Sequence, residues 1–129
     1  MSTIKRFEDI EAWQLARIIC QKIHQLIVSS DLSKEYSLRN QVSAASGSIM
    51  DNIAEGFERD GSKEFRQFLS IAKGSCGEVR SQLYRIKDFG FINDVQFNEL
   101  VELCVAISGK LSKLIQYLNS TSIKGNKFN

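Results

Sequence analysis

The sequence predicts an all-α protein, an antiparallel up-down-up-down four-helix bundle. Apolar residues recur in steps of three and four along four long segments, which is the period of one helix face. Proline is absent and only eight of the 129 residues are glycine. This composition favours long uninterrupted helices, because proline costs about 3 kcal/mol inside a helix. The connections between the four segments are short, so consecutive helices are expected to run antiparallel.

The first two helices are expected at residues 8–28 and 35–56, separated by the polar stretch 31–34. Helical spacing gives the first an apolar face of Ile10, Trp13, Ala16, Cys20, Ile23 and Ile27, and the second a face of Leu38, Val42, Ala45, Ile49 and Ile53. The middle of the second helix, residues 44–48, has almost no side-chain bulk. Such a segment has a weak helix propensity, so we expect that a neighbouring helix approaches it closely.

The third helix is expected to begin at an N-cap, Ser62, and to run to about Asp88, with Gly90 ending it. Its apolar stripe consists of Phe65, Leu69, Ala72, Cys76, Val79, Leu83 and Ile86. A second group of small residues, 72–77, lies within this helix. We expect this group to cross the small residues of the second helix at short range.

The fourth helix is expected to open with a capping box formed by Asn93 and Gln96, and to carry apolar residues as far as Leu118. A chain of this length can enclose one hydrophobic core but not two. We therefore predict a single four-helix-bundle domain over residues 1–129, with an ordered core at about 5–118 and a frayed tail at 119–129.

Composition argues against several classes of protein. The chain has 17 basic and 15 acidic residues, and a net charge of +2 is too small by itself to indicate a nucleic-acid binder. No segment approaches the roughly 20 apolar residues of a membrane span, and the N-terminus lacks the pattern of a signal peptide. Three widely spaced cysteines, an odd number, indicate reduced thiols rather than a disulfide framework. These features predict a cytoplasmic protein without a membrane partner.

Basic residues are concentrated on the third helix. Residues 59–87 contain seven Lys or Arg against three Asp or Glu. Five of them recur every seven residues beside the apolar stripe, namely Arg59, Arg66, Lys73, Arg80 and Lys87. Two interpretations stay open: ion pairs within and between helices, or a surface for an acidic ligand. For the second, the candidate nucleic-acid-binding residues are Arg59, Lys63, Arg66, Lys73 and Arg80.

No catalytic residue, cofactor or metal site is predicted. Five polar residues lie in or beside the apolar stripes: Asn52, Glu55, Ser75, Glu78 and Gln82. A buried hydrogen-bond network that fixes helix register explains them better than an acid/base pair. Cys20 and His24 lie one turn apart, a spacing that suits zinc. Cys76 and Cys104 could complete such a site, yet each cysteine occupies an apolar position, so we interpret all three as small buried apolar side chains.

Three stretches resemble a known family: F-E-D-I-E-A-W at residues 7–13, N-I-A-E-G-F-E-R at residues 52–59, and the segment from Glu64 to Leu83. They are similar to the bacterial four-helix-bundle family often labelled 23S ribosomal RNA intervening-sequence protein, or S23, over about residues 5–118. The resemblance implies a small cytoplasmic bundle that assembles into a homopentamer and whose activity is undefined. A related branch, the accessory variability protein of diversity-generating retroelements, binds nucleic acid and a reverse transcriptase through a positively charged surface.

The residues and the resemblance together predict a non-enzymatic binding scaffold that forms a homo-oligomer, expected to be a pentamer. Its expected ligand is RNA, DNA or a nucleic-acid enzyme, held through phosphate contacts of the third helix. The alternative is a protein–protein interaction module without a nucleic-acid role, in which the basic residues form salt bridges between subunits. Salt separates the two, because phosphate binding weakens steeply as counterions are added and an apolar protein interface does not.

Overall fold

A computed structural model describes residues 4–122, with side chains through residue 120. Four long helices make up the chain: α1 Glu11–Ser29, α2 Tyr36–Glu58, α3 Ser62–Asp88 and α4 Asp94–Ser122. Two short 3-10 turns, η1 Phe7–Asp9 and η2 Asp31–Lys34, precede α1 and α2. The described residues contain no strand. The predicted all-α class is confirmed.

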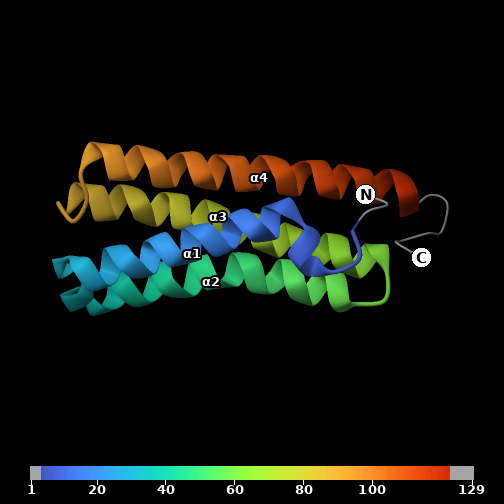
Figure 1. Cartoon of the computed structure of the whole chain (residues 1–129), viewed down its shortest axis with the longest axis horizontal. Coiled ribbons are helices and arrows are strands. Elements are labelled where there is room, and N and C mark those ends of the chain that lie inside the picture. Colours follow the sequence, from blue (N-terminus) through green and yellow to red (C-terminus); the bar gives the residue numbers. More distant parts are fainter. Residues whose placement is uncertain (1–3, 123–129) are drawn as a thin grey trace.

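The helices lie lengthwise beside one another, as Figure 1 shows. The α1–α2 and α3–α4 connections lie at one end of the bundle and the α2–α3 connection at the other, so consecutive helices are antiparallel. Each helix packs against the next one along the chain, and α1 also packs against α4, which closes the bundle. This is the predicted up-down-up-down arrangement.

One hydrophobic core draws on all four helices. Ile19, Ile49, Phe65 and Leu111 are among the side chains that the other helices bury completely. The predicted apolar stripe of α3 lies wholly inside this core. The apolar positions that helical spacing assigned to the first two helices are buried as well, except Trp13 and Cys20, which are half-buried.

Several predicted helix ends are wrong by a few residues. α1 begins at Glu11 rather than residue 8, because residues 7–9 form a separate 3-10 turn. The N-cap of α3 is Gly61, and Ser62 is already the first helical residue with no side-chain cap. α4 continues to Ser122, past the expected last apolar residue Leu118, so residues 119–122 of the predicted frayed tail are helical. The rest of the predicted frayed tail, residues 123–129, lies outside the described part of the chain.

The predicted end of α3 at Gly90 and the predicted capping box at the start of α4 are both confirmed. Gly90 has φ 85°, a left-handed conformation that costs glycine little, and its N–H donates to Lys87 O at 3.0 Å. The Asn93 N–H donates to Gln96 Oε1 at 3.1 Å, and the Gln96 N–H donates to Asn93 Oδ1 at 2.8 Å. These reciprocal bonds are the capping box expected at the start of α4.

The small residues of α2 and α3 form only part of the close helix crossing that was expected from the sequence. Ser48 and Ser75 meet across the helix pair, with 2.9 Å between their Oγ atoms. The nearby glycines, however, face open space, and a Cβ at Gly47, Gly74 or Gly77 would have no heavy atom within 4 Å. The tightest contact occurs instead near the end of α2, where a Cβ on Gly56 would lie 2.5 Å from Phe68 Cβ.

Candidate functional site

The predicted basic residues do not form one continuous row. Arg59 follows the last residue of α2, where its Nη2 lies 2.9 Å from Glu55 Oε2. Its guanidinium carbon lies 5.1 Å from the centre of the Phe68 ring, and Phe68 packs against Gly56 of α2. Arg59 therefore lies on the α2 side of α3 and is separated from the other members of the stripe.

The two ends of the remaining stripe contact α4. Arg66 donates to Asn119 Oδ1 at 3.1 Å. Lys87 forms an ion pair of 3.3 Å with Asp94, and its Nζ lies 4.5 Å from the centre of the Phe97 ring. These contacts place Arg66 and Lys87, and the residues spaced regularly between them, on the flank of α3 that faces α4.

Lys73 and Arg80 lie between those two ends, seven residues and about 10 Å apart along the helix. Both side chains are exposed, and neither forms an ion pair within the described part of the chain. Lys63, in the first turn of α3, is also exposed. The structure thus brings Lys73 and Arg80 together on one face with Arg66, while Arg59 points to another.

The neighbouring flank of α4 carries no acidic group near these two cations. Helical spacing from Asn119 and Phe97 places small and apolar residues there, namely Val101, Val105, Ser108 and Ser112. Glu99 lies on the opposite flank, because it forms an ion pair of 3.0 Å with Lys22 of α1. Glu102 is exposed and forms no ion pair among the described residues. We call the surface formed by Arg66, Lys73, Arg80 and this flank of α4 the basic face.

The predicted hydrogen-bond network between α2 and α3 exists in a smaller form. Asn52 Nδ2 donates to Ser48 O and Ser48 Oγ, both at 2.8 Å, and Ser48 Oγ is bonded to Ser75 Oγ. Glu55 and Glu78 are exposed and take no part in it. Gln82 is buried, but its Oε1 has no hydrogen-bond partner among the described residues. The network links the two helices through short side chains and contains no acid/base pair.

The three cysteines lie in two separate places. Cys20 Sγ donates to Ser46 O of α2 at 3.1 Å, and Cys76 Sγ donates to Cys104 O of α4 at 3.1 Å. Burial raises the pKa of Cys20, and a side-chain hydrogen bond with the Cys76 thiol together with burial raises the pKa of Cys104. Within the described residues, no three His, Cys, Asp or Glu side chains gather as metal ligands would.

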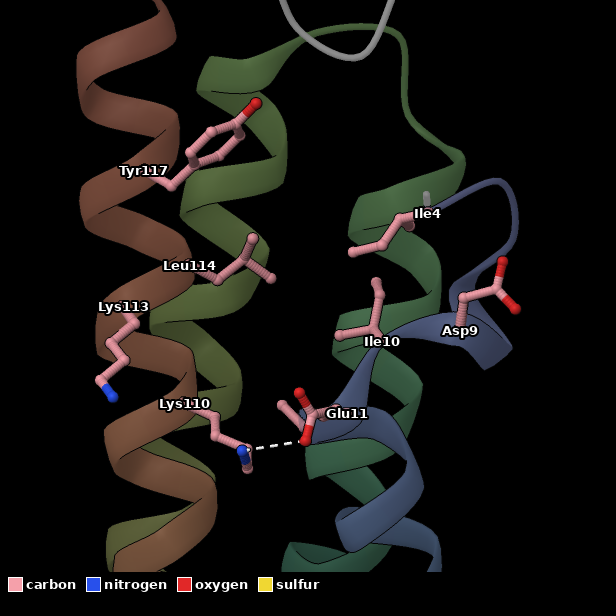
Figure 2. A pocket seen from close by; sticks show the side chains of 9 residues that line it. Ile4, Asp9, Ile10, Glu11, Lys110, Lys113, Leu114 and Tyr117 are labelled. Atoms are coloured by element: carbon pink, nitrogen blue, oxygen red, sulfur yellow. Dashed lines mark hydrogen bonds and ion pairs between the residues drawn. The ribbon is translucent and has the colours of Figure 1, made fainter. Parts of the chain in front are cut away.

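A cleft of about 420 Å³ separates the N-terminal segment from α4 (Figure 2). Ile4, Ile10 and Leu114 form its apolar lining. Its acidic groups already have partners: Glu11 Oε2 lies 3.1 Å from Lys110 Nζ, and Asp9 accepts hydrogen bonds from two backbone N–H groups of the preceding turn. Those two bonds lower the pKa of Asp9. We interpret this cleft as the seam where the N-terminal turn packs onto the bundle.

Comparison with known proteins agrees with this geometry. The sequence profile of the 23S rRNA-intervening sequence protein family matches residues 8–113. The chain belongs to this family. The match includes all four helices, although it ends inside α4, and it confirms the resemblance drawn from the N-terminal and central motifs. The curated proteins include no match to the chain.

The fold of this chain is also found in a solved structure. A crystal structure of a protein of unknown function from the S23 ribosomal protein family of Bacteroides thetaiotaomicron superposes with a TM-score of 0.73. It shares 20% identity, and the alignment covers 81% of this chain and 97% of that chain. At this identity the likeness establishes the fold alone. Neither the family description nor the description of that structure names a reaction. Among the described residues, no helix has the length and apolar character needed to span a bilayer.

Proposed function

We propose that this protein is a non-enzymatic, cytoplasmic scaffold that binds RNA or DNA through the basic face of α3. The observation that carries the proposal is that Lys73 and Arg80 are exposed and form no ion pair among the described residues. Both also lie on one flank of one helix. A pair of unneutralised cations on a rigid helix is suited to contact successive phosphates.

The surroundings of the two cations support this role. Ser108 and Ser112 of α4 are short and Gly77 of α3 has no side chain, so the surface is shallow between Lys73 and Arg80. Two large exposed side chains border it, Val105 of α4 and Tyr84, one turn after Arg80. A phosphate backbone can therefore approach most closely beside Gly77. Lys63 and Arg66 extend the same charge toward the first turn of α3. Contacts to phosphate carry little base information, so we expect weak sequence preference.

Self-association belongs to the same proposal. The basic face of a single bundle has two cations without an ion pair among the described residues, Lys73 and Arg80, and such a small number gives only weak phosphate affinity. A ring of identical subunits repeats the basic face once per subunit, so the number of phosphate contacts rises with the number of copies. We propose a homopentamer, which would have a mass of about 73 kDa, five times the 14.6 kDa of the chain. Sedimentation or light scattering measures this mass directly.

The test compares two double variants of equal charge. Lys73→Glu with Arg80→Glu reverses the two free cations of the basic face. Arg17→Glu with Lys34→Glu makes the same change of four charge units at exposed residues of α1 and η2. Fluorescence anisotropy with a duplex DNA and a structured RNA, from 50 to 300 mM salt, gives the affinity and its salt slope for each.

We expect the basic-face variant to lose at least about 100-fold in affinity and the matched control to lose less than about tenfold, because contacts act locally whereas net charge acts weakly at this salt. Circular dichroism and sedimentation should show both variants folded and assembled like the parent. Equal losses in the two variants would contradict a localised site. A parent protein that binds neither nucleic acid at 50 mM salt would instead favour the protein-interaction alternative, with the basic residues acting between subunits.

A further inference from the structure

A second groove lies between α2 and α3, away from the basic face. Its volume is about 500 Å³, and the residues that line it include Gln41, Ala44 and Ser48 from α2 and Glu78, Gln82 and Arg85 from α3. On the α2 side the groove is open near Ala44 and Ser48, because the side chains of these two residues are small. On the α3 side every one of these residues is polar or charged. The proposed nucleic-acid surface does not use this groove.

Gln82 points to a ligand here. It lines the groove, only 6% of it is exposed, and its Oε1 has no hydrogen-bond partner among the described residues. Folded proteins rarely leave such an oxygen unsatisfied, because its lost hydration is not recovered. The oxygen is itself buried, so it has to turn about the terminal torsion of the glutamine side chain, which has a broad minimum, to face the groove. An arriving donor would complete its hydrogen bonding.

Glu78 supplies a charge beside that oxygen. It lies one helical turn before Gln82 on the same flank of α3, its side chain is exposed, and it forms no ion pair within the described residues. Its carboxylate and the amide oxygen of Gln82 are two acceptors at neighbouring positions. Such a pair attracts a cationic donor, and it lies in the same groove as the positive charge of Arg85.

Arg85 shows which cation fits. Its Nη2 reaches across the helix pair and donates to Gln41 Oε1 at 2.9 Å, so the groove already accommodates one guanidinium at this end. A guanidinium is planar and has five donors in a fixed arrangement, so it can bond two acceptors together, whereas an ammonium presents a compact charge. Toward the other end, Ile71 on the same flank is 52% exposed and offers an apolar contact two turns from Glu78.

We propose that the α2–α3 groove is a docking site for a helix of a partner protein that carries an arginine. The arginine donates to Gln82 Oε1 and to the Glu78 carboxylate, and an apolar residue two turns away on the same helix packs on Ile71. The low lining at Ala44 and Ser48 lets the backbone of the partner helix come close, as in other helix-in-groove complexes. The scaffold would then hold a protein on one flank of α3 and a nucleic acid on the other.

The test uses the full-length protein with glutamine side chains labelled with ¹⁵N and a synthetic alanine-rich helical peptide as the probe. The peptide carries one arginine and, seven residues away, one leucine. A second peptide replaces the arginine with citrulline, which has the same shape but no charge. Titration should shift the side-chain amide signal of Gln82 with the arginine peptide, and binding of the citrulline peptide should be at least about tenfold weaker.

Three variants separate a binding role from a structural one. Glu78→Gln should weaken the arginine peptide at least about fivefold, and Glu102→Gln, the same change at an exposed residue of α4, should leave its affinity unchanged. Gln82→Met should also weaken binding, yet its unfolding midpoint should equal or exceed that of the parent, because an apolar side chain of similar shape removes the unsatisfied oxygen.

Three results would overturn the proposal. Equal affinity for the arginine and citrulline peptides would remove the guanidinium from the interaction. A lower unfolding midpoint for Gln82→Met would show that the amide stabilises the fold and is not kept free for a ligand. Free methylguanidine that binds as tightly as the peptide would indicate a small-molecule site and not a helix-docking surface. None of these results bears on the basic face, whose test uses different residues and a different probe.

Discussion

Substituting Gly56 with alanine tests the tightest contact in the bundle. The added Cβ would lie 2.5 Å from Phe68 Cβ and 3.0 Å from Phe65 Cδ1. Carbon atoms in ordinary contact are about 3.5–4.0 Å apart, so Phe68 would have to withdraw by about 1 Å or more. Because the atom it meets is the Cβ of Phe68, which is fixed to the backbone of α3, no rotamer change relieves the clash. The two helices themselves would have to move apart.

The expected loss is the overpacking cost minus the gain in helix propensity. Overpacking a close contact costs about 1–3 kcal/mol, and the rigid contact at Gly56 suggests the upper half of that range. Alanine in place of glycine returns up to about 1 kcal/mol in a helix. The net destabilisation is then about 1–2 kcal/mol, which corresponds to a fall in Tm of roughly 4–8 °C for a chain of this size.

Gly74→Ala is the matched control, because it makes the same chemical change in the middle of α3 where an added Cβ meets nothing within 4 Å. It should raise stability by about 0.5–1 kcal/mol. Thermal unfolding followed by circular dichroism, at one fixed protein concentration because assembly would shift Tm, measures both variants. If Gly56→Ala matched or exceeded the parent in Tm, the close α2–α3 contact could not be what requires glycine at this position.

Two further predictions concern titratable groups. The hydrogen bonds that Asp9 accepts lower its pKa in the folded protein, so their contribution to stability is complete at neutral pH and is lost as pH falls below about 4. The unfolding midpoint of Asp9→Asn should therefore drop less than that of the parent between pH 7 and pH 3. Equal drops would contradict this assignment. Cys76 and Cys104 are buried, so a thiol reagent at pH 8 should label them at least about a thousandfold more slowly in the native protein than in the urea-unfolded chain. Mass spectrometry measures the labelling rate at each cysteine. Native rates within tenfold of the unfolded rates would show that the contact between α3 and α4 opens frequently.

Much of the fold could be predicted from the sequence because helix formation and burial leave local periodic signals. The apolar stripe of α3 and the capping box at Asn93 were both identified, since each depends on residues three or four positions apart. Helix ends were predicted less well. Competing 3-10 geometry before α1 and the Arg66–Asn119 hydrogen bond near the end of α4 are not visible in local propensity.

The candidate sites depended on contacts between distant segments. A seven-residue spacing grouped Arg59 with Lys73 and Arg80, but Arg59 follows the end of a different helix and pairs with Glu55. Likewise, the sequence showed that residues 44–48 and 72–77 are small, yet only packing revealed that the glycines face outward and that Gly56 makes the close contact. The sequence by itself determined where the four helices lie, apart from their ends, and which face of each is apolar, because both follow from periodicity along one chain. Which cations remain unpaired and which polar atom lacks a partner were decided only in the tertiary structure, because charge pairing and desolvation depend on neighbours that packing brings from other helices.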